Sequence, residues 1–451
     1  MTEQESSYRD RPINIDDAGK RKWVIAKQPK GKWYTRRTIL AWFLLAFLVL
    51  APIIRINGNP LMLFDIAHRH FYIFGISIWA QDTNILALMM AVIVVSIVLF
   101  TVVYGRVWCG WACPQTLFME MVFRRIEYLF DGNHRGGNHK KSTGFKALLK
   151  HMVFFIISMV ITNVFIMWLM GPEGLLDLMK SPIKDNVLIF TVMLGLSIFY
   201  YWIYAHFREQ VCTMICPYGR MQGVLLDSKS IAVIYDYKRG EPRGAKSEGD
   251  CIDCKQCVKV CPTGIDIKNG TQLECINCTA CIDECNSVMR KIKKPKGLIR
   301  YDSHHGVESG KRVLGGTRTY AYTAVLVVLF GILLATIMRR TDVESSILRL
   351  QGTMYQEVDE QTLSNMYNLK IINKTKDDLD LDIKLLSPIE GSIQLATQEV
   401  LLKGNGHLET VLIIKIKKNN LKGKSTPIEI GIFDGEILLE RSDNNFIGPG
   451  N

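Results

Sequence analysis

Two consecutive runs of cysteines in the middle of the chain constrain its fold more than any other feature. Each run has the spacing C-x-x-C-x-x-C-x-x-x-C, and the second begins 14 residues after the first ends. The eight residues are Cys251, Cys254, Cys257, Cys261, Cys275, Cys278, Cys281 and Cys285. Three closely spaced thiolates can bind three corners of a cubane cluster, and the last cysteine of the other run supplies the fourth ligand. The pattern therefore predicts a segment that binds two 4Fe–4S clusters.

The expected ligand sets cross between the two runs. One set is Cys251, Cys254, Cys257 and Cys285, and the other is Cys275, Cys278, Cys281 and Cys261. Pro262 follows the first run and turns the chain, as this crossover requires, whereas Asn286 has that place after the second run. Structural zinc is the alternative, since paired C-x-x-C motifs also bind it. The triple spacing over eight cysteines favours iron–sulfur chemistry, and hence one-electron transfer.

The composition places this segment in a membrane protein. The chain has 451 residues, a formal net charge of +12 and 48% hydrophobic residues, which is too apolar and too basic for an ordinary soluble enzyme. The charge is uneven, because residues 341–451 contain 12 Lys and Arg against 17 Asp and Glu, and the first 340 residues contain 43 against 26. A basic region can indicate nucleic-acid binding. Beside long hydrophobic runs, it instead indicates loops that flank membrane spans on the cytoplasmic side, and no nucleic-acid partner is expected.

Five stretches are apolar enough to cross a bilayer, which needs about 20 residues. They are Thr38–Ile54, Ile85–Tyr104, Met152–Met170, Val187–Ala205 and Tyr320–Met338. A single stretch of this kind could be a buried core helix. Five of them with basic flanks predict five transmembrane helices in contact with lipid.

The distribution of loop charge predicts the orientation of these helices. The 105–147 loop contains seven Lys and Arg and residues 206–318 contain more, whereas the 56–84 loop contains one and the 171–186 loop two. Basic loops stay in the cytoplasm. The N-terminus and the two basic segments are therefore expected inside, and the two short loops and the C-terminal part outside. Arg339 and Arg340 oppose this rule locally, but long C-terminal domains cross largely regardless of charge.

This orientation puts all twelve cysteines on the cytoplasmic side, where thiols stay reduced. The first 37 residues are polar and contain ten Lys and Arg, so they predict a cytoplasmic tail and no cleavable signal peptide. Trp33 and Tyr34 are expected at the membrane interface. On the outer side, Phe71–Trp79 is predicted to form an aromatic hairpin at the membrane surface.

The remaining four cysteines form a duplicated motif, C-x-x-x-C-P. Cys109 and Cys113 follow the second predicted span, and Cys212 and Cys216 follow the fourth. Two helices and a motif, repeated once, indicate a twofold internal repeat. The spacing i, i+4 places both sulfurs of a motif on one helical face, so four thiolates meet if the two halves pack together.

Several chemistries fit such a group of thiolates. Soft sulfur ligands favour Cu(I), zinc or a further iron–sulfur cluster, and a redox dithiol is another alternative. The four cysteines could also be only packing residues, since free cysteine behaves as a small buried hydrophobe. His206, six residues before Cys212, is a candidate ligand, although an interfacial role is the simpler interpretation. His68 and His70 are a weaker candidate copper pair in the outer loop.

The last hundred residues change character. Alternating apolar and polar residues in Asn368–Ile372, Leu379–Leu385, Leu408–Lys417 and Ile428–Phe433 predict short strands of a β-sandwich. The predicted chain is thus a multi-domain membrane protein: an α-helical bundle of five spans, an inserted two-cluster ferredoxin domain of the α+β class, and a C-terminal all-β Ig-like sandwich. The predicted domains are the tail 1–37, the four-helix membrane domain 38–218, the ferredoxin domain 219–318, the fifth helix 319–340 and the sandwich 341–451.

The order of these parts resembles the cytochrome c oxidase accessory proteins of the FixG/CcoG type. The resemblance covers roughly residues 30–445, and stretches such as Trp108–Gln115 and Cys212–Gln222 are similar to that family. It implies a bacterial inner-membrane protein that reduces Cu(II) to Cu(I) for the assembly of cbb-type cytochrome c oxidase. The implied site of reduction is the group Cys109, Cys113, Cys212 and Cys216. A cytoplasmic electron donor, copper-delivery proteins and oxidase subunits are the implied partners, and a homodimer is compatible with this interpretation.

Two other functions remain open at this point. Residues 85–290 are also similar to quinol dehydrogenases of the NapH type, which would make the chain an electron carrier fed by quinol. Alternatively the chain is a non-enzymatic assembly scaffold whose outer sandwich binds oxidase subunits.

Overall fold

The computed structural model describes residues 23–56, 58–66, 70–79, 82–132, 143–311, 316–350, 355–375, 377–388, 391–396, 401–404, 406–421 and 423–449. The chain forms two compact units, Met1–Leu333 and Leu334–Asn451. Most of the predicted tail 1–37, its first 22 residues, lies outside the described residues.

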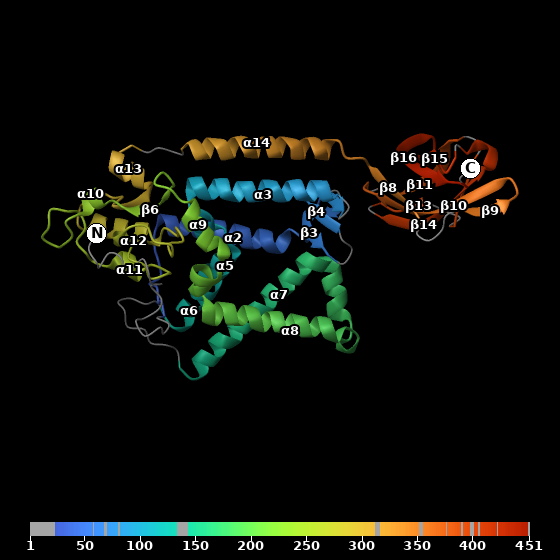
Figure 1. Cartoon of the computed structure of the whole chain (residues 1–451). Helices are drawn as coiled ribbons and strands as arrows, with labels where there is room; N and C mark the ends of the chain where they lie inside the picture. The colour runs from blue at the N-terminus through green and yellow to red at the C-terminus, as the bar shows by residue number, and fades with distance from the viewer. Residues whose placement is uncertain are drawn as a thin grey trace. The chain divides into compact units, whose positions relative to one another are not determined.

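Five long helices confirm the predicted spans (Figure 1). They are α2 (Lys32–Leu50), α3 (Thr83–Tyr104), α7 (Phe145–Lys180), α8 (Val187–Trp202, continued by the π-turn η3, Ile203–Phe207) and α14 (Thr317–Met338). Only 6–33% of the residues in their most apolar stretches are buried inside the protein. Because most apolar side chains face outward, these are lipid-facing helices and not helices of a soluble core.

Helix α7 extends ten residues beyond the predicted end of the third span. Gly171 has φ 79° and ψ 164°, and Pro172 starts a second helical segment that runs to Lys180, so most of the predicted 171–186 loop is helical. A proline lacks the N–H that a first helical turn leaves unpaired, and glycine tolerates the positive φ before it. Figure 1 shows the resulting bend, and Trp168 near it donates from Nε1 to the Leu48 carbonyl at 2.7 Å.

Three short strands confirm the aromatic hairpin between the first two spans. The strands β3 (Met62–Asp65), β4 (His70–Ile73) and β5 (Ile76–Trp79) form an antiparallel sheet. His70 is buried in this sheet, with its ring stacked on Trp79 at 4.2 Å. The suggested partner of His70 in a copper pair, His68, lies outside the described residues.

The N-terminus of α2 is fixed by the ferredoxin domain. Asp283 accepts the backbone N–H groups of Trp33 and Tyr34, the latter at 2.8 Å, and so caps a helix that lacks a cap of its own. The Trp33 ring lies edge-on to Trp111 and Tyr301. Residues 23–37 are therefore held by contacts with later segments, and Trp33 packs against Trp111 and Tyr301.

The ferredoxin domain is built on two antiparallel strands, β6 (Ala232–Tyr235) and β7 (Ile299–Asp302). Between them lie α10 (Tyr237–Gly240), α11 (Gln256–Lys259), the 3-10 turn η5 (Ile267–Asn269) and α12 (Ala280–Lys291), and α13 (His304–Ser309) follows. Apolar side chains from β6, α10, η5, α12 and β7 share one core with six of the eight cysteines.

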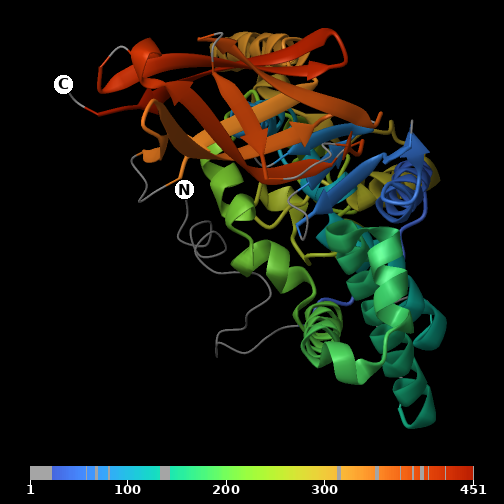
Figure 2. The ribbon, with the colours of Figure 1, turned by 90° about the vertical axis from the view of Figure 1, so that its right-hand side faces the viewer.

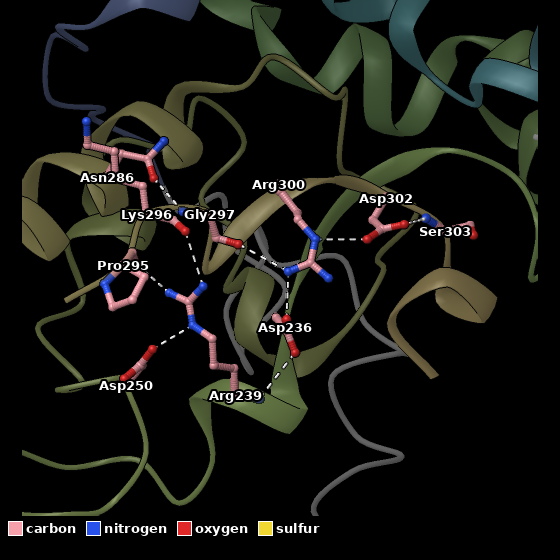
Figure 3. Close-up of polar contacts among 10 residues, drawn as sticks. All are labelled: Asp236, Arg239, Asp250, Asn286, Pro295, Lys296, Gly297, Arg300, Asp302 and Ser303. Carbon is pink, nitrogen blue, oxygen red and sulfur yellow. Dashed lines mark hydrogen bonds and ion pairs between the residues drawn. The ribbon is translucent and has the colours of Figure 1, made fainter. Parts of the chain in front are cut away.

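Polar contacts tie the segment before the first cysteine run to β7 (Figure 3). Arg300 donates from Nη1 to Asp236 at 2.6 Å and from Nε to Asp302 at 2.8 Å. Arg239 donates from Nε to Asp250 at 2.6 Å. These half-buried ion pairs fix the chain directly before the first cysteine.

The C-terminal unit is a sandwich of two antiparallel sheets, drawn in orange and red in Figure 2. One sheet has the order β12-β14-β10-β8 with β9 on β10, and the other has the order β13-β11-β15-β16. The strands are β8 (Val343–Arg349), β9 (Gln356–Asp359), β10 (Thr362–Asn373), β11 (Leu379–Ser387), β12 (Ser392–Leu395), β13 (Leu401–Leu402), β14 (His407–Lys417), β15 (Ser425–Asp434) and β16 (Ile437–Ile447). Alternate residues such as Leu412, Ile414 and Ile416 are fully buried between the sheets. The predicted all-β sandwich is confirmed.

Candidate metal centres

Four cysteines of one predicted ligand set line a single cavity near the surface of the ferredoxin domain, here called the outer cavity. They are Cys251, Cys254, Cys257 and Cys285, and Tyr235, Leu298 and Ile299 supply apolar wall. Cys251 is buried, whereas Cys254 is exposed. The outer cavity therefore approaches solvent at Cys254.

The second set lines another cavity, here called the inner cavity. Its cysteines are Cys261, Cys275, Cys278 and Cys281, with Cys257 at its edge. The remaining wall is mainly apolar and includes Val233, Ile265 and Ile276. The chain thus crosses between the two runs and brings together the same two groups of four thiols that the spacing predicts as ligand sets.

The backbone around both cavities is shaped for an anion. Asp253 and Lys255 in the first run and Asn277 and Thr279 in the second have φ between 51° and 66°. Each pair flanks the second cysteine of its run, and such left-handed turns point successive N–H groups inward. Backbone N–H groups of Val258, Asn277, Ala280 and Ile299 donate to the sulfurs of Cys257, Cys275, Cys278 and Cys285. Thiolate-bound clusters fit these two cavities.

Burial keeps these thiols protonated in the absence of a metal. It raises the pKa of Cys257, Cys275 and Cys285 to about 12 and that of Cys278 to about 11, while the N–H donors oppose the rise. Across the described ranges, no three His, Cys, Asp or Glu side chains are close enough to bind a single metal ion.

The two C-x-x-x-C-P motifs have the same backbone course. Gly105 (φ 57°, ψ −130°) and Arg208 (φ 54°, ψ −122°) each lie four residues before the first cysteine of a motif. Cys113 and Cys216 are both extended and both precede a proline that starts a helix. The elements are α4 (Val107–Trp111) and α5 (Pro114–Leu117) in the first motif, and the π-turn η4 (Val211–Ile215) and α9 (Pro217–Leu225) in the second.

The two motifs bring their cysteines into one neighbourhood, here called the four-thiol group: Cys109, Cys113, Cys212 and Cys216. Negative charge on Cys113 or Cys216 raises the pKa of the Cys109 thiol. Negative charge on any of the other three cysteines of the group likewise raises the pKa of Cys212. Cys109 Sγ lies 3.5 Å from Gln222 Oε1, and Cys212 Sγ lies 4.0 Å from Thr116 Oγ1. Burial raises the pKa of Cys109 to about 11 and of Cys212 to about 12, although all four residues are partly exposed.

The four-thiol group is in direct contact with the inner cavity. Gly110 packs so closely that a Cβ atom there would overlap the carbonyl oxygen of Ile276 and lie 3.1 Å from the backbone nitrogen of Cys278. Trp111 Nε1 donates to the Asn277 carbonyl at 3.3 Å, and Cys109 packs against the core that contains Ile276 and Cys278. This junction joins the first motif to the loop that lines the inner cavity.

The candidate ligand His206 contacts an aromatic side chain, and its role as a metal ligand stays a prediction. Its ring packs edge-on against Trp23 at 5.8 Å, on the side of the N-terminal segment. This contact gives His206 a packing role. The side chains that sequence reasoning missed are two buried cations, Arg37 and Arg106, whose contacts come from distant segments.

Comparison with known proteins places these features in a family. A family model described as "4Fe-4S dicluster domain" matches residues 207–247 and 241–304, and one described as "4Fe-4S binding domain" matches residues 86–133. A third model, "IG-like fold at C-terminal of FixG, putative oxidoreductase", matches residues 333–449. Protein RdxA of Cereibacter sphaeroides is 32% identical over 82% of this chain and 85% of its own length. The chain belongs to the FixG family.

Two further members support the same assignment. Protein RdxB of Cereibacter sphaeroides is 29% identical over 90% of both chains. The nitrogen fixation protein FixG of Rhizobium meliloti is 27% identical over 89% of this chain and 86% of its own. With its five spans and two 4Fe–4S binding domains, this FixG-type chain is a membrane iron–sulfur electron-transfer protein.

Proposed function

We propose that this chain reduces Cu(II) to Cu(I) at the four-thiol group for the assembly of a cbb-type cytochrome c oxidase. One observation carries the proposal: the partly exposed four-thiol group contacts the inner cavity through Gly110. A substrate ion that reaches these thiols lies beside a one-electron centre. When bound, the clusters supply the single electron that each cupric ion takes up.

The four thiols would retain the product. Thiolates are soft ligands that select Cu(I), and a cuprous ion needs no more than two of them. Because burial raises the pKa of Cys109 and Cys212, each thiol that binds copper must release its proton. The electron transfer itself requires no acid–base pair.

The cellular setting belongs to the same proposal. Loop charge and family likeness favour a bacterial inner membrane, with the N-terminus and the cysteines in the cytoplasm and the C-terminal sandwich in the periplasm. A cytoplasmic donor would reduce the clusters near the exposed Cys254. The sandwich would dock copper-delivery proteins or oxidase subunits, and a homodimer is compatible with this arrangement.

The test uses the full-length protein, purified anaerobically in detergent and reduced with dithionite. Excess reductant is removed before Cu(II) and a Cu(I)-specific chelator are added. The variant with Ser at positions 109, 113, 212 and 216 is expected to lose Cu(I) formation, and His206→Ala is the matched control that keeps it. If the four-serine variant forms Cu(I) at the normal rate, the site is wrong.

A third cluster at the four-thiol group is the second candidate. The 4Fe–4S family models cover residues 86–133 and 207–247, which contain these four cysteines. Iron and sulfide contents separate the two candidates: about eight iron atoms per chain correspond to two cubanes and about twelve to three.

A further inference from the structure

Two arginines are buried beside the inner cavity, and neither has a carboxylate partner in the part of the chain that the structure describes. Arg37 in α2 is 1% exposed and Arg106, after α3, is 6% exposed, and neither forms an ion pair with a described residue. Arg37 donates from Nε to the Gly110 carbonyl at 2.6 Å, and Arg106 donates to the carbonyls of Leu273 and Gly219. One nitrogen of each guanidinium, Nη2 of Arg37 and Nε of Arg106, is buried without a hydrogen-bond acceptor in the described part of the chain.

Both charges act at the boundary between the inner cavity and the four-thiol group. Burial raises the pKa of Cys278, and the Arg37 charge opposes the rise. The Arg106 charge interacts with Cys275 of the inner cavity and with Cys109 and Cys216 of the four-thiol group. Two carboxylates also act electrostatically here, Glu274 on Arg106 and Glu120 on Cys278. Glu120 is itself paired with Arg124 at 2.6 Å.

The outer cavity has a buried cation of a different kind. Lys268 lines this cavity, and its side chain is 4% exposed. Its ammonium group pairs with Asp253 and, at 3.5 Å, with Asp266. Two carboxylates therefore neutralise the cation at the outer cavity, whereas the two cations at the inner cavity have no direct carboxylate partner among the described residues.

This difference has an electrostatic consequence for reduction. A cubane bound by four thiolates is an anion, and reduction adds one more negative charge. Leaving a buried cation without an anionic partner is costly, and the cost falls when negative charge grows beside it. Net charge around a cluster is one of the factors that set its reduction potential.

We propose that the positive charges of Arg37 and Arg106 raise the reduction potential of the inner cluster above that of the outer cluster. With clusters bound by the cysteines of both cavities, an electron that enters at the outer cluster would be transferred to the inner cluster and be held there, next to the four-thiol group. This inference depends on the two clusters and not on copper as the substrate. If the copper assay fails, the inference about the two cluster potentials can still be tested by the redox titration below.

The test is a redox titration of the anaerobic full-length protein, followed by electron paramagnetic resonance and visible absorbance. Arg37→Gln and Arg106→Gln are each expected to shift the electron equilibrium between the clusters at least tenfold toward the outer one. For a one-electron couple, tenfold corresponds to about 59 mV. Arg37→Lys and Arg106→Lys keep the charge and are expected to stay near the wild-type values.

Lys268→Gln is the matched control at the other cavity. It removes a cation from between two carboxylates, so it is expected to lower the potential of the outer cluster and leave the inner one unchanged. Unshifted potentials in the Gln variants, with full iron and sulfide, would overturn the proposal. Loss of inner-cluster iron in both the Gln and the Lys variants would also overturn it, because it would show a structural role only.

Discussion

The eight cysteines of the ferredoxin domain and the four of the four-thiol group are held in different ways. The eight lie within 35 residues, and local left-handed turns and backbone N–H donors shape their cavities. The four come from two segments about a hundred residues apart, which only the packing of the helical bundle brings together. The first arrangement is local and the second is tertiary. A substitution that destabilises the helical bundle should therefore disrupt the four-thiol group and leave the two cluster cavities intact.

A buried ion-pair network supports the four-thiol group. Arg208, at the positive φ before the second motif, donates both terminal nitrogens to Glu127 at 2.9 Å. Glu127 belongs to α6 (Arg124–Phe130), which follows the first motif through the π-turn η1 (Phe118–Phe123). Arg124 lies between Glu120 at 2.6 Å and Glu209 at 4.0 Å. Among the described residues, these ion pairs include no cysteine of the ferredoxin cavities, and only the charge of Glu120 acts on one of them, Cys278.

The largest expected effect comes from the junction itself. Gly110→Val places a side chain where the Ile276 carbonyl lies, and it should force the first motif away from the inner cavity. A displacement of about 1 Å can lower a rate about a hundredfold, which is the expected loss in single-turnover oxidation of the reduced protein by Cu(II). Stopped-flow absorbance measures it. Gly195→Val is the control, because a Cβ there meets nothing within 4 Å. An unchanged rate in Gly110→Val would mean that electrons leave by another route.

The next effect separates the two arrangements directly. Glu127→Gln removes the bidentate partner of the Arg208 guanidinium and leaves it Glu209 at 3.7 Å, at an expected cost of about 2 kcal/mol to the helical bundle. Copper reduction should fall while the iron of the two ferredoxin clusters is retained. Glu429→Gln, in an exposed pair with Arg441, is the control and should cost well under about 1 kcal/mol. Equal loss of cluster iron and copper reduction would contradict the division into local and tertiary sites.

A pH effect is expected for the ferredoxin domain without clusters. Burial raises the thiol pKa of Cys275 and Cys257 from 9.0 to about 12, so the folded apo-protein favours neutral thiols. Its stability is complete below pH 9 and falls as the pH rises toward 12, by about 1.4 kcal/mol per pH unit for each such thiol. Thermal unfolding of apo-protein at pH 8, 9 and 10 checks this. Cluster-loaded protein, whose thiolates are already deprotonated, should lose much less; an equal loss would refute the interpretation.

The smallest effect concerns the C-terminal unit. Tyr367 in one sheet donates its hydroxyl to the Asn445 carbonyl in the other sheet at 2.9 Å. Tyr367→Phe should lower the free energy of unfolding of the sandwich by about 1 kcal/mol. Denaturant unfolding followed by circular dichroism measures it, and cluster absorbance should not change. A change in the clusters would show that the two units are energetically coupled.

The features that sequence predicts well are those whose physics is local. The cysteine spacing defines both cavities because each ligand set needs only a short turn and one crossover. Alternation in Leu408–Lys417 and Ile428–Phe433 identifies strands because every second residue enters one core. The strand β16 was not predicted from the sequence because its centre, Glu440–Asn445, is polar. Its pairing with β15, and not an alternating pattern of its own, makes it a strand.

Other features depend on contacts that no local pattern reveals. Arg37 counts as one of ten basic residues in a polar tail, yet it is buried against Gly110, 73 residues later. Pro172 indicates the end of a span, but Gly171 absorbs the bend and the helix continues. The pairing of the two C-x-x-x-C-P motifs was foreseeable from their duplication, whereas their contact with the inner cavity through Gly110 was not.

The cap on α2 has a consequence for how the protein is made. Asp283, which accepts the Tyr34 N–H, follows that residue by 249 positions. At about 5–20 residues per second, translation delivers this carboxylate on the order of ten seconds or more after the helix start has left the ribosome. The first span must therefore enter the membrane with its N-terminal turn uncapped. Its N-terminal turn gains this cap only after α12 has been made, so the final placement of the first helix depends on a segment translated much later.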